Sequence, residues 1–185
     1  MKRGQIFFIS GAPGVGKSTT ARALANHFEK SILFDIDYFR SLVVKGIKQP
    51  TSGWDEETEL QFRLAHQAVG SVAKIYSDAG FAVIAEHCSS PEMVQEFLDF
   101  SMGGVFVCLK ADIQTNLARN LTRINKSFDP KDIEHFVLSL GESLWLEFER
   151  AGITVLDNTN FQIEETVQKI LSVQLRRVPE RIKSI

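Results

Sequence analysis

The chain has 185 residues, 44% of them apolar, which is enough for one domain with a full core and too little for two large ones. Its net charge of −2 provides no overall positive field, so nucleic acid is not an expected partner. No apolar run reaches the length of a membrane span, so we expect no membrane partner and a cytoplasmic location. The two cysteines, Cys88 and Cys108, lack metal-ligand spacing and are expected to be buried free thiols.

A glycine-rich segment follows the apolar run 6–9 and precedes an amphipathic stretch. It consists of Gly11, Ala12, Pro13, Gly14, Val15, Gly16, Lys17 and Ser18, with Thr19 next in the chain. This order of strand, turn and helix predicts a phosphate-binding loop, because glycines let backbone N–H groups converge on a polyphosphate at the positive end of a helix. We expect Lys17 to reach the β- and γ-phosphates of ATP, and the Ser18 hydroxyl to bind Mg²⁺.

Beyond this loop, apolar runs alternate with amphipathic stretches. Strands are expected at 32–34, 81–85, 105–109 and 153–156, and helices at 19–30, 38–46, 54–79, from Pro91, from Asp112 to Leu121, at 130–151 and at 163–177. The core stripe expected for helix 54–79 is Leu60, Leu64, Ala68, Val72 and Ile75, and that of the next helix is Met93, Phe97 and Phe100. This alternation predicts an α/β fold, a parallel sheet with helices on both faces. Neither a linker nor a repeat divides residues 1–185, so we expect a single domain.

Polar residues follow the strands of this sheet. In parallel α/β sheets ligands bind beyond the carboxyl ends of the strands, so these residues are expected to lie near the phosphate loop. They are Asp35, Asp37, Glu86, His87, Lys110, Asp157, Asn158 and Thr159.

The paired aspartates fit the acceptor side of a phosphoryl transfer, because a carboxylate is needed near an attacking hydroxyl. Alternate residues share one side of a strand, so Asp35 and Asp37 are expected to point the same way. We assign Asp37 to the acceptor hydroxyl, as orienter or base, and Asp35 to magnesium through water or to shared orientation. The competing interpretation is that one of the two caps the following helix.

Further side chains are candidates for the same site. Glu86 is expected to bind a magnesium water or to act as a second base, and the alternative is a hydrogen bond to a backbone turn. His87 is expected to be a pocket or core histidine rather than a catalytic one, and as a pocket histidine it is a candidate for binding the acceptor. Arg40 is a candidate for an anionic group on the acceptor, and Trp54 for stacking on it, whereas an ion pair and a helix-start anchor are the respective alternatives.

Two arginines and one turn complete the predicted site. Arg119 and Arg123 lie four residues apart on one helix face, where guanidinium groups can stabilise charge on the transferred phosphoryl group. A solvated helix face with ion pairs is the alternative. The turn Asp157, Asn158 and Thr159 is placed to contact adenine or ribose, or is an ordinary turn.

With these motifs together, the chain resembles the small P-loop kinases, a group that includes gluconate kinase, shikimate kinase and chloramphenicol phosphotransferase. The resemblance implies a three-layer P-loop NTPase fold, a five-stranded parallel sheet in the order 2-3-1-4-5, ATP with Mg²⁺, and a small mobile lid, here around 119–131. In these kinases the aspartates after the second strand face the acceptor, which carries over to Asp35 and Asp37. Shikimate kinases have a glycine triplet after the third strand, where this chain has Glu86, His87 and Cys88.

The leading functional hypothesis is an ATP-dependent kinase for a hydroxyl of a small polar molecule, such as a sugar acid, a related metabolite or an antibiotic. We expect it to act as a monomer or homodimer. The alternatives are a P-loop nucleotide hydrolase or switch without an acceptor, and a kinase acting on nucleotides or nucleic-acid ends. The basic end of the chain, from Arg176 to Lys183, is the feature that favours the nucleic-acid alternative.

Overall fold

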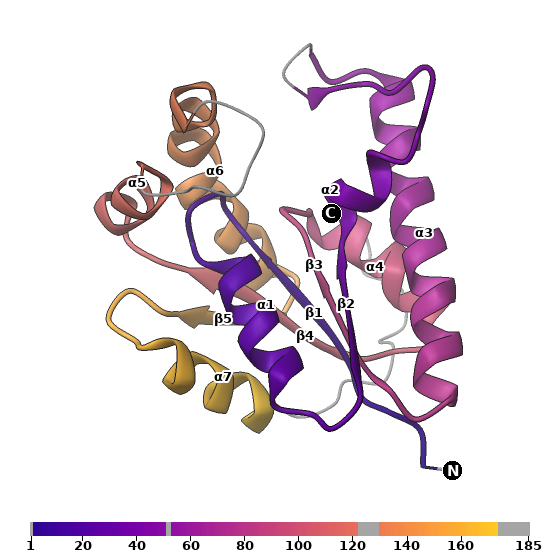
Figure 1. The fold of residues 1–185 in the computed structure, drawn as a ribbon. Coiled ribbons are helices and arrows are strands. Elements are labelled where there is room, and N and C mark those ends of the chain that lie inside the picture. The colour runs from indigo at the N-terminus through magenta and orange to yellow at the C-terminus, as the bar shows by residue number, and fades with distance from the viewer. Residues whose placement is uncertain (1, 51–52, 122–129, 174–185) are drawn as a thin grey trace.

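The computed structural model describes residues 2–50, 53–121 and 130–173, which form a three-layer α/β fold (Figure 1). The central sheet has five parallel strands in the order β2-β3-β1-β4-β5, so both the predicted fold class and the expected strand order are confirmed. The strands are β1 (Ile6–Gly11), β2 (Ser31–Asp35), β3 (Ala82–Glu86), β4 (Val105–Lys110) and β5 (Thr154–Asp157).

Helices cover both faces of this sheet (Figure 1). One face is covered by α1 and α7, and the other by α3, α4 and α6. The helices are α1 (Lys17–Asn26), α2 (Ile36–Arg40), α3 (Glu56–Asp78), α4 (Pro91–Ser101), α5 (Ile113–Leu121), α6 (Pro130–Arg150) and α7 (Ile163–Ser172).

The central strand β1 contributes to both cores, because successive residues of a strand point to opposite faces. Ile6 and Phe8 pack in the core with α3, α4 and α6, whereas Phe7 and Ile9 pack in the core with α1 and α7. All four side chains are buried, as expected for a central parallel strand that is covered on both sides. The phosphate loop therefore begins at the end of a strand that is packed against helices on both faces of the sheet.

The strand register brings the carboxyl ends together at one edge. Glu86 of β3 lies in register with Asp35 of β2 on one side and with Ile9 of β1 on the other. Across the sheet, Lys110 of β4 is paired with Asp157 of β5. The residues predicted to share this edge of the sheet are therefore neighbours across adjacent strands.

The helix predicted at 38–46 is shorter and begins earlier. Helix α2 starts at Ile36 because the carboxylate of Asp35 accepts a hydrogen bond from the backbone N–H of Tyr38 and so caps it. Asp37 consequently lies in the first turn of a helix. The reasoning that Asp35 and Asp37 share one side of a strand was wrong.

The predicted core stripe of α3 was also wrong. Leu60, Leu64 and Ile75 are 47%, 53% and 66% exposed, and the buried face is the one that carries Phe62, Ala65, His66, Val69 and Ala73. Gly70 lies on this buried face, where an added Cβ would be only 2.6 Å from the carbonyl oxygen of Phe97 on α4. Two apolar stripes run along α3, and the one with small residues allows the closer helix packing.

Other expectations had mixed outcomes. Ser90 caps α4 and Pro91 is its first residue, as predicted, but Phe100 is exposed and was wrongly assigned to the core. Cys88 and Cys108 are free thiols, and burial raises the pKa of both. Cys108 is buried as expected, whereas Cys88 is partly exposed.

Some predictions fall outside the described residues: Arg123, most of the lid around 119–131, and the basic end from Arg176 to Lys183. Within the ranges that the structure does describe, none of the helices combines the length and the apolar character needed to cross a membrane.

Candidate active site

The phosphate loop has the backbone conformation that its glycines allow. Gly14 and Gly16 have φ angles of 85° and 98°, in the left-handed region that disfavours other residues. A Cβ on Gly14 would lie 2.4 Å from the carbonyl oxygen of Asn116 on α5. Gly16 is the N-cap of α1 and has no side chain to cover the first N–H groups of the helix. These groups are therefore placed to bind an anion.

Lys17 and Ser18 open α1 and have different surroundings. The Lys17 side chain is buried, and its Nζ donates a hydrogen bond to the carbonyl oxygen of Ala12 at 3.1 Å. The Ser18 hydroxyl donates to Oε1 of the buried Glu86 at 2.6 Å. Because the hydroxyl proton goes to Glu86, the lone pairs of Ser18 Oγ are available to a cation. These residues fit a magnesium-bound triphosphate. Pro13 and Thr19 complete the predicted loop, and Thr19 is exposed on the first turn of α1.

Glu86 and His87 are adjacent in the chain but contact different parts of the site. Glu86 lies against the phosphate loop through Ser18. His87 Nε2 lies 3.2 Å from Oδ1 of Asp37, on the side where the acceptor is expected. The end of β3 therefore connects the phosphate loop to the aspartate after β2.

Asp37 is flanked by two positively charged or proton-donating groups. In addition to His87, the guanidinium Nη1 of Arg40 lies 4.0 Å from the same oxygen, Oδ1. Asp37 is about half exposed, with 49% of its side chain accessible, whereas both partners are 5% exposed. A partly exposed carboxylate held from its buried side is suited to contact a ligand.

Arg40 lies within an aromatic stack. Its guanidinium lies 3.6 Å from the ring centroid of Phe62, which in turn stacks on Trp54 at 5.0 Å. Nη2 of Arg40 donates to the carbonyl oxygen of Lys48, and Nε has no hydrogen-bond partner among the described residues. Burial lowers the pKa of Arg40, and Asp37 partly opposes that shift.

The exposed Trp54 ring is anchored by its Nε1–H, which donates to Glu59 at 2.9 Å. Trp54 is therefore an aromatic anchor at the start of α3, as the alternative interpretation held, and its role in stacking on an acceptor stays a prediction.

On the other side of the phosphate loop, Arg119 and Asn158 converge on Val15. The carbonyl oxygen of Val15 accepts from Asn158 Nδ2 at 2.9 Å and from Arg119 Nη1 at 3.5 Å. Arg119 Nη2 also lies 3.3 Å from the carbonyl oxygen of Asn158 and 3.4 Å from that of Thr159. The structure thus brings α5, the loop and the turn after β5 together, as the prediction required.

The side chains of the turn after β5 have structural partners. Asp157 accepts hydrogen bonds from the hydroxyl and the backbone N–H of Thr159, which hold its pKa below the ordinary value. The Thr159 hydroxyl also accepts from the backbone N–H of Asp112, at the start of α5. Asp157 and Thr159 therefore shape the turn, and Asn158 is the turn residue whose side chain contacts the phosphate loop.

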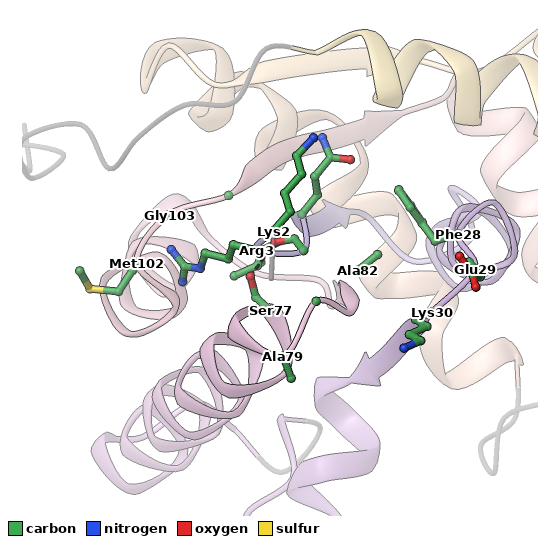
Figure 2. A pocket seen from close by; sticks show the side chains of 15 residues that line it. Lys2, Arg3, Phe28, Glu29, Lys30, Ser77, Ala79, Ala82, Met102 and Gly103 are labelled. Carbon is green, nitrogen blue, oxygen red and sulfur yellow. Dashed lines mark hydrogen bonds between the residues drawn. The ribbon is translucent and has the colours of Figure 1, made fainter.

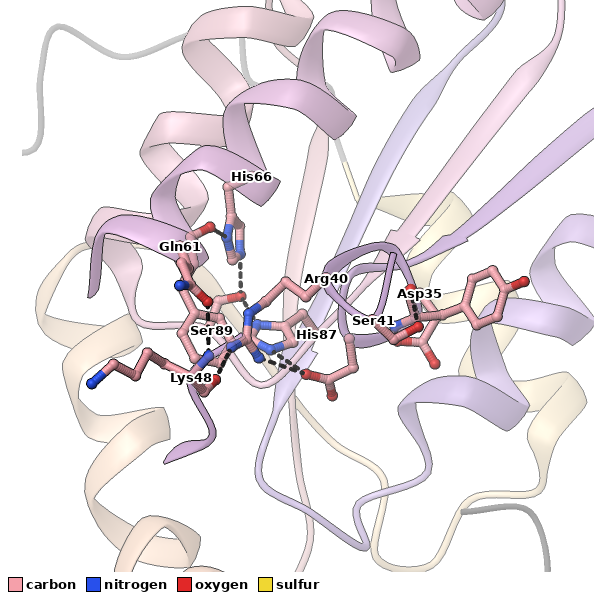
Figure 3. Close-up of polar contacts among 11 residues, drawn as sticks. Asp35, Arg40, Ser41, Lys48, Gln61, His66, His87 and Ser89 are labelled. Atoms are coloured by element: carbon pink, nitrogen blue, oxygen red, sulfur yellow. Dashed lines mark hydrogen bonds and ion pairs between the residues drawn. The ribbon is translucent and has the colours of Figure 1, made fainter. Parts of the chain in front are cut away.

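Sequence reasoning missed three polar residues behind Asp37. They are Ser10 at the end of β1, His66 on α3 and Ser89 after β3, and all three are buried. Ser89 Oγ contacts both His66 Nε2 and His87 Nδ1 (Figure 3). For His66, the sequence did contain a signal: it follows Phe62 at helical spacing and so belongs to the second apolar stripe of α3, the one that is buried.

A hollow of about 890 Å³ lies at the opposite edge of the sheet, around the beginnings of β1, β3 and β4 (Figure 2). It is lined by Lys2, Arg3, Lys30, Ser77 and Met102, among others. None of the predicted site residues lines it, so it is separate from the candidate site.

The family model for chloramphenicol phosphotransferase-like protein matches residues 4–131, which is more than half of the chain. No curated protein matches the chain in sequence. Among solved structures, the tunicamycin resistance protein of Deinococcus radiodurans is similar, with 19% identity over 94% of this chain and 98% of that chain and a TM-score of 0.60.

Two metabolic kinases are also similar in structure. A gluconokinase from Sinorhizobium meliloti 1021 is 16% identical over 92% of this chain and 91% of its own, with a TM-score of 0.58. The shikimate kinase from Acinetobacter baumannii, in complex with shikimate, is 19% identical over 92% of both chains, with a TM-score of 0.58. At such low identity these likenesses show a shared fold. Together with the family match and the phosphate loop, they indicate that the chain belongs to the chloramphenicol phosphotransferase-like protein family of small P-loop kinases.

Proposed function

We propose that this protein is an ATP-dependent kinase that moves the γ-phosphate of ATP to a hydroxyl group of a small polar molecule. The observation that carries the proposal is that one edge of the sheet holds both the phosphate loop and the Asp37 carboxylate. The adjacent residues Glu86 and His87, at the end of β3, contact Ser18 of the loop and Asp37, respectively. A nucleotide hydrolase or switch needs only the loop. The carboxylate held by buried groups favours a kinase with an acceptor.

The donor side follows from the loop. ATP would supply the phosphoryl group, and magnesium would compensate its charge. The N–H groups at the start of α1 and the Lys17 ammonium would hold the phosphate oxygens, and Ser18 would ligate the metal ion with its proton held by Glu86. We keep the prediction that Arg119 compensates charge on the transferred group, and that Asn158 helps to hold the nucleotide.

On the acceptor side, Asp37 would accept a hydrogen bond from the attacking hydroxyl. As the new O–P bond forms and the bond from the γ-phosphorus to the bridging oxygen breaks, the hydroxyl proton would pass to Asp37. Phosphoryl transfer depends mostly on positioning, so the orientation of the hydroxyl matters more than early removal of its proton. Arg40, adjacent to Asp37, and the exposed Trp54 ring are the side chains we propose for acceptor selection.

The acceptors that we propose are sugar acids, related metabolites and antibiotics. The two free thiols support a reducing compartment, and we propose that the protein acts in the cytoplasm, as a monomer or homodimer.

The test is Mg²⁺-dependent ADP release from ATP by the purified protein, with and without pooled hydroxyl compounds. The pools are sugar acids, shikimate, nucleosides, aminoglycosides and phenicols. We expect one pool to stimulate ADP release, and Lys17→Ala and Asp37→Asn to abolish the stimulation. Asp99→Asn on the outer side of α4 is the matched control, because it makes the same chemical change away from the site and should leave the stimulation intact.

The alternatives predict different results. ADP release that ignores every pool and survives Asp37→Asn would refute the kinase and indicate a hydrolase or switch. Stimulation by nucleosides alone would indicate a nucleotide kinase.

A further inference from the structure

A continuous chain of short polar contacts runs from Asp37 into the core, and Figure 3 shows its members His87, Ser89 and His66. Asp37 Oδ1 lies 3.2 Å from His87 Nε2, and His87 Nδ1 lies 2.8 Å from Ser89 Oγ. Ser89 Oγ lies 2.7 Å from His66 Nε2, and His66 Nδ1 lies 2.7 Å from the carbonyl oxygen of Phe62. The two histidines and the serine are buried, so these contacts are sheltered from water.

The donor and acceptor of each hydrogen bond can be assigned by starting from the Phe62 carbonyl, at the buried end of this chain of contacts. The Phe62 carbonyl can only accept, so His66 Nδ1 carries a proton. Burial, and then the charge of His87, lower the pKa of His66 to about 3, so this imidazole is neutral at pH 7 and its Nε2 is an acceptor. The single proton of the Ser89 hydroxyl must therefore be donated to His66.

This direction determines what His87 presents to Asp37. Because the Ser89 proton is committed to His66, Ser89 Oγ can only accept from His87, and His87 Nδ1 must carry a proton. The contact between His87 Nε2 and the Asp37 carboxylate needs a proton as well, because two lone pairs would repel each other. His87 therefore donates its Nδ1 proton to Ser89, and one proton joins its Nε2 to the Asp37 carboxylate.

The inner part of this chain is held rigidly. Ser10 at the end of β1 donates its hydroxyl to the Ser89 carbonyl at 2.9 Å and accepts from the Ser89 N–H at 3.1 Å. The His66 ring stacks on Phe8, with 5.8 Å between ring centroids. The Ser89 hydroxyl is thus held between the two histidines by the central strand that also carries the phosphate loop.

We propose that His66, Ser89 and His87 form a positioning relay that fixes the orientation of the Asp37 carboxylate toward the acceptor hydroxyl. The inference rests on the proposed function, since it takes Asp37 as the group that contacts the acceptor. A half-exposed aspartate on a short helix has two rotatable side-chain bonds, and a reaction that depends on positioning is slowed when they are not restrained. His87 acts through Asp37 and is a positioning residue.

The first test is ¹⁵N NMR of the imidazole nitrogens in the protein of residues 1–185 at pH 7, without nucleotide. The chain has four histidines, and single substitutions to glutamine assign their signals. We expect His66 as the neutral tautomer protonated at Nδ1, and His87 with a proton on Nδ1. Ser89→Ala should shift the ring signals of both, whereas Ser90→Ala, which removes the neighbouring hydroxyl that caps α4, should leave them in place.

The second test is kinetic and uses the acceptor pool that stimulates the wild-type protein. Ser89→Ala should lower kcat about 10-fold without changing KM for ATP, because the carboxylate loses its orientation while the phosphate loop is intact. In a His87→Ala background the same change should cause no further loss, since Ser89 acts on Asp37 through His87. His87→Gln, which retains a donor for Asp37, should keep more activity than His87→Ala, and this comparison holds if Ser89→Ala fails to fold.

Either test can overturn the relay. His66 protonated at Nε2, a His87 without a proton on Nδ1, or additive losses from Ser89→Ala and His87→Ala would each reject it. A wild-type protein that shows the expected histidine signals, yet no acceptor-stimulated ADP release, would instead reject the kinase function and with it the role of the relay toward an acceptor.

Discussion

The His66→Gln substitution is expected to remove a loss of stability that the wild-type protein shows below pH 7. Burial is the main reason that the pKa of His66 falls from 6.5 to about 3, and the charges of His87 and Arg40 act in the same direction. The Phe62 carbonyl and Asp37 oppose the shift. In the unfolded chain this histidine regains its ordinary pKa, so between these two pH values the unfolded state binds more protons than the folded state.

The sign and the magnitude follow from this difference. Stability falls as the pH falls through the unfolded pKa, and the loss is complete below the folded pKa. One pKa unit corresponds to about 1.4 kcal/mol, so the full effect is about 5 kcal/mol. Lowering the pH from 7 to 5 should remove about 2 kcal/mol of the free energy of unfolding. With a urea dependence of about 2 kcal/mol/M, the unfolding midpoint should fall by about 1 M.

The assay is urea unfolding at pH 7 and pH 5, followed by tryptophan fluorescence. The wild-type midpoint should fall by about 1 M more than that of His66→Gln, because the two proteins share every other titratable group. His27→Gln is the matched control: His27 is exposed at the end of α1, so this variant should behave as the wild type does. Equal falls of the midpoint in the wild type and in His66→Gln would refute the conclusion that His66 is buried as a neutral imidazole.

Three further substitutions test the packing, the loop and a cap. Gly70→Ala should destabilise the protein by about 1–3 kcal/mol in thermal unfolding, because its Cβ would meet the Phe97 carbonyl oxygen at 2.6 Å, and this strain exceeds the gain in helix propensity of about 1 kcal/mol. Arg119→Ala should weaken ATP binding about 10-fold by calorimetry, because the Val15 carbonyl of the phosphate loop loses a donor. Ser90→Ala should cost about 1 kcal/mol of stability in urea unfolding, because α4 loses its N-cap.

Contrary results would be equally informative. A stabilised Gly70→Ala protein would mean that α3 and α4 can separate without cost. Unchanged ATP affinity in Arg119→Ala would assign this arginine to the shape of the fold alone. An unchanged midpoint in Ser90→Ala would mean that another group satisfies the first turn of α4.

Much of the fold follows from local sequence pattern. The apolar run of β1 is buried on both faces, and such runs are typical of central parallel strands. The phosphate loop was recognisable because its function depends on backbone N–H groups and on glycines at adjacent positions, which are local properties. The N-cap of α4 by Ser90 was predictable for the same reason.

Which residues come together on the acceptor side could not be predicted from local sequence pattern, because it depends on tertiary structure. Asp35 and Asp37 have the same spacing whether a strand continues or a helix begins, and the hydrogen bond from Tyr38 to Asp35 decides for the helix. His66, Ser89 and His87 come from α3 and from the segment after β3, and no local pattern links their side chains. Their meeting depends on how α3 packs against the sheet.

The sequence by itself determined the alternation of strands and helices, the phosphate loop and the sheet edge where ligands bind, because each depends on residues close together in the chain. Tertiary structure alone decided which of the two apolar stripes of α3 is buried. Periodicity shows that a stripe exists, but the space available against α4 selects the stripe with Gly70 and small side chains, and this choice directs His66 toward Ser89 and leaves Leu64 exposed.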